Sequence, residues 1–350
     1  MPDASILLGT CEGAAYLPEL IESIRGQSET RWTLWTRDDD SSDASPEILR
    51  RAAAADPRVV ILQDQRGRLG PAGNYGLLAQ RAHDAGAQYQ FFADQDDVWH
   101  ADKLRKQIVV MERAQRAYGA GTPHLVYSDV TVVDERLRLV HPSFLAASRL
   151  VHGEGRPLAT LLGRNFVPGC ACMINRHAAE LALPIPETAA SPDWWVALAT
   201  AAAGRISYLD EPTVEYRRHA YTVSGPAAFW SGFNPLRYSW PTRWQTGLVR
   251  FRQSIVQARI LRDRLRDRKG DSPHLCAAPS GPFRQMGTVP FSAAADEEFD
   301  LLVRFCEVFE RPEHGLARIR RLRRLGVPAI DRVRRLIYYV CVLRLGRSVP

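Results

Sequence analysis

The sequence predicts an α/β protein built on a mainly parallel sheet, and three observations support this. Four apolar segments have the length and composition of buried strands: 5–9, 32–36, 58–62 and 89–93. Segments with helical spacing of apolar residues separate them: 16–26, 46–55 and 72–85. Acidic residues cluster directly after the second and fourth strands. Strands that alternate with helices of this length form βαβ units with right-handed crossovers.

Local signals justify the individual elements. The helix at 16–26 places its apolar residues on one face. Ser45 before Pro46 is typical of an N-cap followed by proline at the first helical position. Past the fourth strand we expect a helix at 101–118 and an Ala-rich helix at 194–203. Further extended segments are expected at 124–129, 131–133, 171–175, 205–209 and 211–218.

The composition changes near Gly225, where we place the boundary between two regions. The chain has 350 residues with 45% hydrophobic and 24% charged side chains, which is typical of a globular protein long enough for two domains. Residues 1–225 hold the α/β pattern, whereas residues 226–350 are basic and helical. We expect a long Arg-rich helix at 243–268 and two or three basic helices at 299–345, separated by a mobile loop at 270–290 that is rich in Gly, Pro and Ser.

The charge distribution indicates an anionic surface as a partner. The formal net charge is +7, acidic residues crowd the first 215 positions, and Arg dominates from Arg217 onward. A basic C-terminal face fits a membrane or a nucleic acid. The apolar segment at 337–345 is too short to span a bilayer. The six cysteines show no paired spacing and the N-terminus shows no signal-peptide pattern, so we expect reduced thiols and a cytoplasmic location.

The acidic cluster after the fourth strand predicts a cation site. An apolar strand leads into Asp94-Gln95-Asp96-Asp97, and ligands of open α/β sheets bind at such strand ends. Gathered carboxylates raise each other's pKa unless a cation joins them. Hard divalent cations take carboxylate oxygens and often share them with substrate phosphates. The alternative is a polar loop whose acids cap the helix that begins near Ala101.

The cluster after the second strand, Arg37-Asp38-Asp39-Asp40-Ser41-Ser42-Asp43, is open to two interpretations. Asp and Ser favour turns and helix caps, so part of the segment serves that purpose. Three consecutive acids exceed what a turn requires. A carboxylate at a strand end can also accept the N–H of a pyrimidine base.

Asp193 and His219 are candidates outside the two clusters. Ser191-Pro192-Asp193 is a good helix start, where an acid stabilises the helix dipole. Burial beside Trp194 and Trp195 would instead raise the pKa of Asp193 and suit it to the role of a general base. A lone histidine is more often structural, but Arg217 and Arg218 before His219 favour an anion site.

In this pattern the chain resembles family 2 glycosyltransferases of the GT-A fold, and within them the rhamnosyltransferases of bacterial surface polysaccharides. The resemblance covers about residues 4–225. Several motifs carry it in order: Ile6-Leu7-Leu8-Gly9-Thr10, Tyr16-Leu17, Ser23-Ile24-Arg25-Gly26-Gln27, Trp32, Arg37-Asp38-Asp39 with Ser41-Ser42-Asp43, Leu69-Gly70 with Asn74-Tyr75, Ala93-Asp94-Gln95-Asp96-Asp97-Val98-Trp99, Asn165 with Pro168-Gly169-Cys170, Asp193-Trp194-Trp195, and Tyr216-Arg217-Arg218-His219.

The resemblance implies a role for each matching residue. Thr10, Asp38 and Asp39 would hold the nucleotide base, and Asp94-Gln95-Asp96 would be the DXD motif. Asp96 would bind Mg²⁺ or Mn²⁺ together with His219, with Asp94 near the ribose. Arg217, Arg218 and His219 would face the diphosphate. Asp193 would be the catalytic base, with Trp194 and Trp195 on the acceptor side.

Three departures from the family pattern concern base contacts and acceptor choice more than the reaction class. Cys11-Glu12 stands where the family usually has Tyr-Asn. Asp40 stands where a Gly usually follows the paired acids, and Asp tolerates the left-handed turn expected there. Pro192 stands where His commonly precedes the catalytic Asp.

The function expected from the sequence is inverting transfer of a sugar from a nucleotide diphosphate. The resemblance implies a deoxyhexose such as rhamnose, a dTDP- or UDP-linked donor, and a lipid-linked or growing surface glycan as acceptor. The basic C-terminal region would then dock on the anionic inner face of the plasma membrane. Two rivals are a non-catalytic nucleotide-sugar or lipid-binding scaffold and a nucleic-acid-binding protein. No Gly-rich or aromatic RNA-binding signature supports the latter, and no GxGxxG follows the first strand, which disfavours a dinucleotide enzyme.

Overall fold

The computed structural model describes residues 4–148, 155–219, 240–271, 291–327 and 332–344. Within this part a nine-stranded mixed sheet runs in the order β3-β2-β1-β4-β8-β6-β9-β5, with β7 paired to β6. The first four strands in the chain are mutually parallel, as predicted: β1 (Ala4–Thr10), β2 (Trp32–Asp38), β3 (Val59–Ile61) and β4 (Tyr89–Ala93). Their carboxyl ends therefore lie at one edge of the sheet.

The second half of the sheet is more irregular than the sequence pattern predicts. β8 (Cys172–Asn175) runs antiparallel between β4 and β6. The segments expected as separate strands merge into β6 (His124–Val133) and β9 (Arg205–Arg217), which pair in parallel with two register shifts. The short strands β5 (Val98–Trp99) and β7 (Leu139–His141) were not predicted, because two or three residues carry no readable period.

Helices cover both faces of the sheet. The helices of the first part are α1 (Leu17–Arg25), α2 (Ser45–Ala55), α3 (Gly70–Asp84), α4 (Lys103–Tyr118), α5 (Phe144–Ala147), α6 (Pro157–Leu161), α7 (Arg176–Ala182) and α8 (Pro192–Ala203). Alternate strand residues supply the two cores, since successive side chains of a strand point to opposite faces. In β1, Ile6 and Leu8 join the core beneath α1, α2 and α4, whereas Leu7 joins the core beneath α3, α7 and α8.

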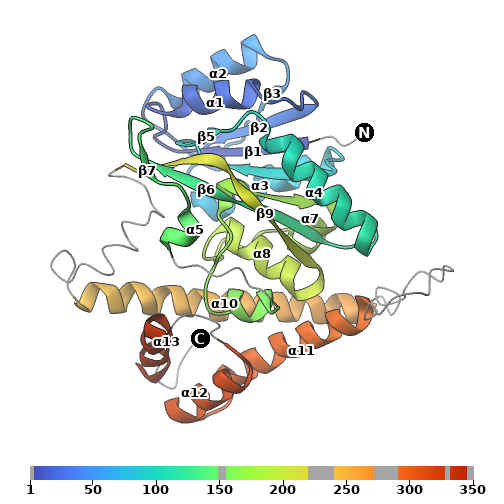
Figure 1. The fold of residues 1–350 in the computed structure, drawn as a ribbon, viewed down its shortest axis with the longest axis vertical. Coiled ribbons are helices and arrows are strands. Elements are labelled where there is room, and N and C mark those ends of the chain that lie inside the picture. Colours follow the sequence, from blue (N-terminus) through green and yellow to red (C-terminus); the bar gives the residue numbers. More distant parts are fainter. Residues whose placement is uncertain (1–3, 149–154, 220–239, 272–290, 328–331, 345–350) are drawn as a thin grey trace.

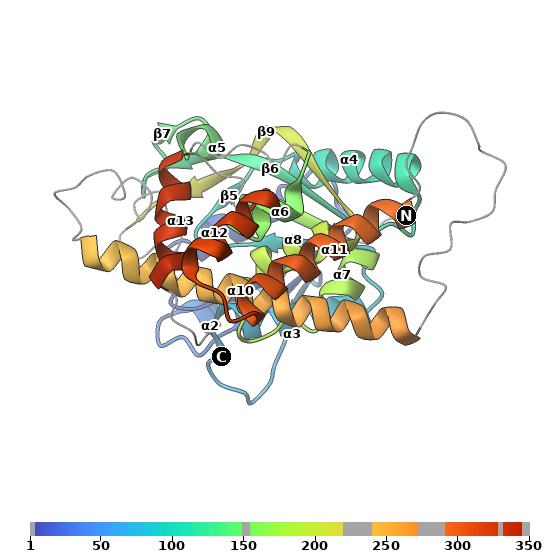
Figure 2. The same ribbon diagram turned by 90° about the horizontal axis from the view of Figure 1, so that it is seen from below.

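The C-terminal helices pack on the second of these cores. They are α10 (Trp240–Asp271), α11 (Phe291–Glu310), α12 (Gly315–Arg324) and α13 (Arg332–Arg344). They lie together at the end of the molecule below α8 in Figure 1, and Figure 2 shows them crossing one another there. Ile255 of α10 and Phe305 of α11 belong to the same hydrophobic cluster as Trp195 of α8. The basic region is therefore held against the α/β part by buried apolar contacts.

Two expectations from the sequence fall largely outside the described residues, and two others can be checked within them. The boundary near Gly225 and nearly all of the loop predicted at 270–290 lie outside them. None of the cysteines within the described ranges, namely Cys11, Cys170, Cys172, Cys306 and Cys341, takes part in a disulfide. Among the described helices, none combines the length and the apolar character that crossing a membrane requires.

Candidate active site

The acidic loop after β4 is tied to the loop after β1 by Gln95. The Cys11 N–H donates to Gln95 Oε1 at 2.8 Å, and Gln95 Nε2 donates to the Cys11 carbonyl at 2.9 Å. Gly13 makes room for this side chain, because a Cβ there would lie 2.5 Å from Gln95 Oε1. The middle residue of Asp94-Gln95-Asp96 is thus structural, and it fixes where the two flanking carboxylates stand.

The carboxylates of this loop occupy unlike surroundings. Asp94 accepts a hydrogen bond from the Tyr75 hydroxyl at 3.2 Å, and burial, aided by the charges of Asp96 and Asp193, raises the pKa of Asp94 to about 7. Asp97 is fully buried, and burial with the nearby acids holds its pKa well above its usual value. Its Oδ1 accepts the Arg217 N–H at 3.1 Å, whereas its Oδ2 makes no regular hydrogen bond among the described residues, and the neighbouring Cys170 thiol is only a weak donor to this carboxyl. A buried, unsatisfied carboxylate oxygen calls for a ligand or an explanation.

The residues at this loop fit a divalent cation. The predicted pair is brought together, since His219 Nε2 lies 2.8 Å from Asp96 Oδ2. Ligand atoms of Asp94, Asp97 and Cys170 lie within 4.8 Å of one another just beside it. Carboxylate oxygens with an imidazole suit Mg²⁺ or Mn²⁺, and added positive charge would relieve the repulsion that raises the carboxyl pKa values.

Arg217 has a different role from the one expected. Its side chain is buried, and its guanidinium donates to the backbone oxygens of Asp96 at 2.8 Å and Glu135 at 2.7 Å, and to the Glu19 carboxylate. It also lies 4.7 Å from the centroid of the Tyr16 ring. These contacts leave it clamping the end of β9 to the acidic loop, so the expectation that Arg217 faces the diphosphate is wrong in this structure.

The two following residues remain candidates for anion binding. The Arg218 backbone N–H donates to the Val133 carbonyl at 2.9 Å, and its side chain is half-buried. The ring of His219 lies 4.8 Å from that of Tyr16, which orients it toward Asp96. Because the Arg217 guanidinium already donates to protein oxygens, Arg218 is the arginine of this motif that stays a candidate for binding a diphosphate.

The acids after β2 are mostly satisfied by the protein itself. Asp38 accepts from the Thr10 hydroxyl at 2.9 Å, and from the backbone N–H and the hydroxyl of Ser41 at 2.8 and 2.6 Å. Asp40 adopts the left-handed conformation expected for it, with φ 64°. These contacts confirm the turn-building interpretation for part of the segment, and they keep Thr10 and Asp38 side by side at the sheet edge.

Asp39 was expected to hold the nucleotide base, but most of its acceptor sites are occupied by groups of the protein. It is buried, accepts from Arg37 Nη1 at 2.7 Å, and accepts from the backbone N–H groups of Leu69 and Gly70 at 2.7 and 2.8 Å. Arg37 in turn binds Asp64 with two hydrogen bonds. A carboxylate has about four acceptor sites, and three here are taken. Asp39 chiefly holds the loop that leads into α3.

Asp193 lies at the start of α8, next to the loop that contains Asn165. It follows Pro192 in the first turn of α8, and its Oδ2 accepts from Asn165 Nδ2 at 2.6 Å. Gly169 allows a close approach, because a Cβ there would stand 3.1 Å from Asp193 Cβ. Burial raises the pKa of Asp193, and its charge raises the pKa of Asp94. A residue about a hundred positions beyond the acidic loop is therefore within electrostatic reach of it.

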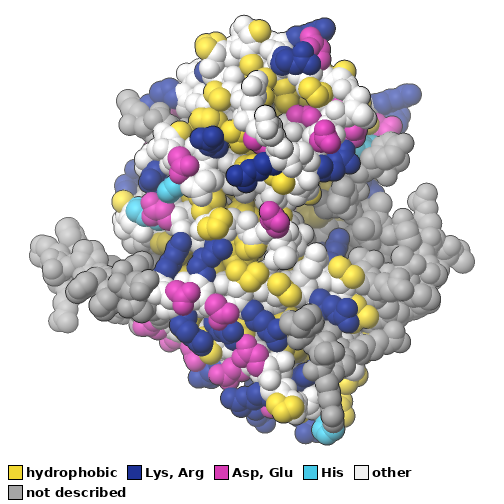
Figure 3. Space-filling view, turned by 180° about the vertical axis from the view of Figure 1, so that it is seen from behind, with side chains coloured by type: hydrophobic (Ala, Val, Ile, Leu, Met, Phe, Trp, Pro, Cys, Tyr) yellow, Lys and Arg dark blue, Asp and Glu magenta, His cyan; other side chains and the backbone are white. Residues whose placement is uncertain are grey.

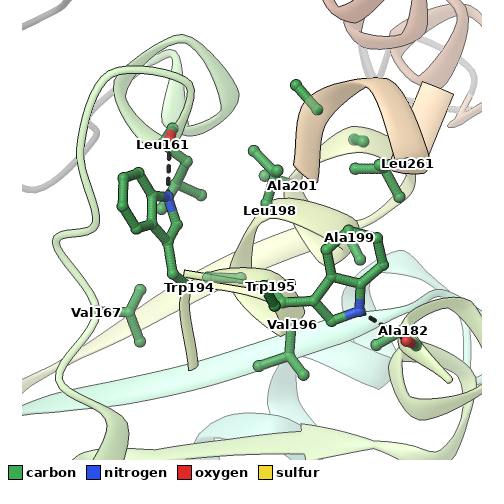
Figure 4. Packing of buried hydrophobic residues seen from close by; sticks show 14 of the residues in the cluster. Leu161, Val167, Ala182, Trp194, Trp195, Val196, Leu198, Ala199, Ala201 and Leu261 are labelled. Carbon is green, nitrogen blue, oxygen red and sulfur yellow. Dashed lines mark hydrogen bonds between the residues drawn. The ribbon is translucent and has the colours of Figure 1, made fainter. Parts of the chain in front are cut away.

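The two tryptophans after Asp193 belong to the core. Trp195 is fully buried, its Nε1–H donates to the Ala182 carbonyl at 2.7 Å, and Arg264 of α10 lies over its ring. Trp194 is 7% exposed, and its Nε1–H donates to the Leu161 carbonyl at 2.8 Å. Figure 4 shows the two rings pointing to opposite sides of α8 within the packed cluster. The expected acceptor-side role is wrong for Trp195, and Trp194 has little surface left for it.

The sequence analysis missed several residues of the site. Tyr75 and Asn165 belong to motifs that carry the family resemblance, but no role was predicted for them. No sequence pattern pointed to Lys103. The Lys103 side chain is buried, and its Nζ donates to Gln107 Oε1 at 2.7 Å and lies 4.6 Å from the centroid of the Trp99 ring. Burial lowers the pKa of Lys103 to about 8. Gln107 lies only four positions away, but the burial of Lys103 and its contact with the Trp99 ring depend on tertiary packing, which no local pattern indicates.

Comparisons with known proteins relate most of the chain to glycosyltransferases. Residues 5–180 match the sequence profile described as glycosyl transferase family 2. A protein named as a teichuronic acid biosynthesis glycosyltransferase, TuaG of Bacillus subtilis, is 26% identical over 220 residues, which are 62% of this chain and 79% of TuaG. The dTDP-rhamnosyl transferase RfbG of Shigella flexneri is 26% identical over 102 residues, 29% of this chain and 35% of RfbG.

A solved structure shares the fold. The S. aureus TarS structure superposes with a TM-score of 0.51 at 15% identity, covering 99% of this chain and 53% of that one. The 1–349 portion of TarS, solved in complex with UDP-GlcNAc, gives a TM-score of 0.50 and covers 98% of this chain and 90% of that one. At this identity the likeness shows the fold alone, which is a GT-A-like α/β fold. On the match over residues 5–180, the chain belongs to glycosyl transferase family 2.

Proposed function

We propose that the protein is a metal-dependent, inverting glycosyltransferase. The observation that carries the proposal is the convergence of Asp94, Asp96, His219 and Asp193 at the carboxyl ends of the parallel strands. Transfer from a nucleotide diphosphate needs a group that stabilises the leaving diphosphate and a base that deprotonates the acceptor hydroxyl. The acidic loop with His219 would stabilise the leaving diphosphate, and Asp193 would deprotonate the acceptor hydroxyl.

The residues support a direct displacement. Asp193 takes the proton of the acceptor hydroxyl while the hydroxyl oxygen attacks the anomeric carbon. The new carbon–oxygen bond forms as the bond to the diphosphate breaks, so the configuration inverts. Mg²⁺ or Mn²⁺ held by Asp96 and His219 would neutralise the charge that develops on the leaving diphosphate. Arg218 adds positive charge on the same side, and Thr10 and Asp38 line the place of the base.

The donor is proposed to be a deoxyhexose nucleotide such as dTDP-rhamnose, and the acceptor a lipid-linked or growing surface glycan. The likeness to RfbG, named as a dTDP-rhamnosyl transferase, supports this sugar. The likeness to TuaG, named for teichuronic acid biosynthesis, supports a surface polymer as acceptor. A UDP-linked donor is the competing choice, supported by the TarS complex with UDP-GlcNAc.

The decisive experiment compares the full-length protein with Asp193→Asn. Release of nucleoside diphosphate is measured with dTDP-rhamnose, UDP-GlcNAc, UDP-glucose and GDP-mannose, each with Mn²⁺, Mg²⁺ or EDTA. We expect one donor to be turned over only with a cation, and Asp193→Asn to lower turnover by roughly 10²–10⁴ while donor affinity stays. A non-catalytic scaffold would bind a donor and release nothing in any condition. Unchanged turnover in Asp193→Asn would make Asp193 a helix cap only.

We also propose that α12 and α13 dock on anionic membranes. Leu322 of α12 is fully buried, so part of the apolar side of these helices packs against the protein. The outer face nevertheless combines exposed leucines with exposed arginines: Leu316, Leu336, Leu343, Arg320, Arg323, Arg324 and Arg335. Figure 3 shows basic and hydrophobic side chains in the lower part of the molecule, together with several acidic ones. A mixture of exposed leucines and arginines suits a lipid surface.

The docking is tested with point variants, because truncation would expose the apolar cluster that these helices share with α8. Arg323→Glu with Arg324→Glu should reduce sedimentation with phosphatidylglycerol vesicles, and salt should have the same effect. The matched control is Arg50→Glu with Arg51→Glu, on the exposed face of α2 at the other end of the molecule. If both double variants lose vesicle binding equally, net charge alone explains the binding, and α12 and α13 do not form a docking face.

A further inference from the structure

We propose that Asn165 is a positioning residue whose side-chain amide fixes the orientation of the Asp193 carboxylate and keeps it ionised for proton abstraction. The inference rests on the proposed function, since it assigns Asp193 the role of base. Asn165 Nδ2 donates to Asp193 Oδ2 at 2.6 Å, which is short for an N–H···O bond and typical of one to a charged acceptor.

The amide is itself held rigidly. Its Oδ1 accepts the Val167 N–H at 3.0 Å, and its Nδ2 also donates to the Val167 carbonyl at 3.1 Å. The two bonds to one residue define which end of the amide is nitrogen, because a flipped amide would meet two mismatched partners. The donor toward Asp193 is therefore set by the loop before the reaction begins, which is the preorganisation a catalytic group needs.

Packing completes the cradle of Asp193. The same loop continues into Gly169, whose missing Cβ lets the backbone come close to the Asp193 side chain. Asp193 is thus confined between the loop at 165–169 and the first turn of α8. Alanine at 169 would push against Asp193 Cβ at 3.1 Å and would displace the carboxylate.

The chemical role of Asn165 follows from the groups that face Asp193. Asp94 at the end of β4 and the Cys172 thiol on β8 are its electrostatic neighbours, and neither adds positive charge. Burial raises the pKa of Asp193, whereas hydrogen bonds from Ser191, from the N-terminal amides of α8 and from Asn165 lower it. An amide stabilises the carboxylate without titrating, so the balance stays fixed as the pH changes. A general base works best with a pKa near the working pH.

The first test is the pH profile of kcat/KM in Asn165→Ala, with the donor that the screen identifies. Losing a bond to the ionised form raises the pKa of the base, so the acidic limb should move to higher pH. A move of about one pH unit lowers kcat/KM about tenfold below the limb and much less above it. Donor affinity should stay the same. A loss of equal size at every pH would overturn the inference, because a merely structural defect does not move a limb.

A second test needs no substrate. The difference in Tm between wild type and Asn165→Ala should grow as the pH rises and Asp193 ionises, because the amide binds the carboxylate more strongly than the neutral acid. In an Asp193→Asn background this pH dependence should vanish. The Asn165→Ser variant keeps a hydroxyl that can donate, so its pH limb and its Tm should lie between those of wild type and Asn165→Ala. It also serves as the test if the alanine variant folds poorly.

The matched control is Asn175→Ala. Asn175 is likewise an asparagine whose side chain contacts the backbone several times, but it is buried whereas Asn165 is half-buried, and it caps α7 at the far end of β8. Asn175→Ala should lower Tm without moving the acidic limb of the pH profile.

The role of Asn165 and the role of Asp193 can be contradicted independently of each other. If Asp193→Asn keeps its turnover, the base assignment falls; if Asp193→Asn is inactive and the limb of Asn165→Ala does not move, only the role of Asn165 falls.

Discussion

The two acidic clusters, one after β2 and one after β4, look alike in the sequence but differ in how far the protein satisfies them. After β2, Asp38 accepts from Thr10 and Ser41, and Asp39 accepts from Arg37 and two backbone N–H groups. After β4, Asp97 keeps a buried oxygen without a regular hydrogen bond and Asp94 has a pKa of about 7. Both stand at the same edge of the sheet.

The difference assigns the two clusters to different tasks. A buried carboxylate that is already matched by donors stabilises the loop that supplies them. A buried group of carboxylates with too few donors is costly, and it is retained where a ligand completes it. The first cluster therefore chiefly stabilises the loops at this edge of the sheet, and the second is where the proposed cation belongs. Three predictions probe this contrast.

The largest effect should come from Asp96→Ala in the second cluster. Removing this carboxylate takes away a ligand of the proposed cation and the partner of His219, so turnover should fall by at least about 100-fold, as for other groups that stabilise developing charge. Donor binding should lose its dependence on Mn²⁺, measured by titration with and without EDTA. Asp84→Asn, on the exposed end of α3, is the control and should behave as wild type. Intact cation dependence in Asp96→Ala would remove the contrast between the clusters.

The first cluster should respond in stability rather than in cation binding. Arg37→Leu leaves Asp39 buried without its charged partner, and breaking one side of a buried ion pair costs about 3–5 kcal/mol of unfolding free energy. Urea unfolding measures this cost, and adding Asp39→Asn should recover part of it. Arg51→Ala removes an exposed pair with Glu47 and should cost no more than about 0.5 kcal/mol. A small effect at Arg37 would mean that the network is not what holds the loop.

The smallest effect is a pH dependence of cation binding to the second cluster. The pKa of Asp94 is about 7 when folded and lies near 3.8 in its ordinary state, so the folded protein binds the extra proton between these values. Without a cation, stability should therefore fall as the pH rises through that window. A cation competes with this proton, so its apparent affinity should weaken by up to about tenfold per pH unit below 7. Thermal shifts with MgCl₂ between pH 5.5 and 8 measure the effect, and a shift that is constant with pH would contradict it.

The sequence alone determined the parallel βαβ part, the positions of both acidic clusters and the helix start at Asp193. These features depend on local apolar periodicity, on helix-start signals and on the rule that ligands meet strand ends. The merging of β6 and β9, the antiparallel β8 and the short β5 depend on pairing between distant segments. The left-handed turn at Asp40 was expected from the family resemblance, in which a Gly usually stands there, and Asp tolerates that conformation.

Only the tertiary structure decided what each polar residue does. Arg217 meets Glu19 across 198 positions, Arg37 meets Asp64 across 27, and Asn165 meets Asp193 across 28. The sequence shows that an arginine or an aspartate is present, but its partner determines whether it binds a ligand or holds a loop. The same holds for Trp195 and for the basic helices, whose buried apolar side chains belong to the same cluster as those of α8. The cost of burying a polar group depends on what surrounds it, and those surroundings are assembled from distant parts of the chain.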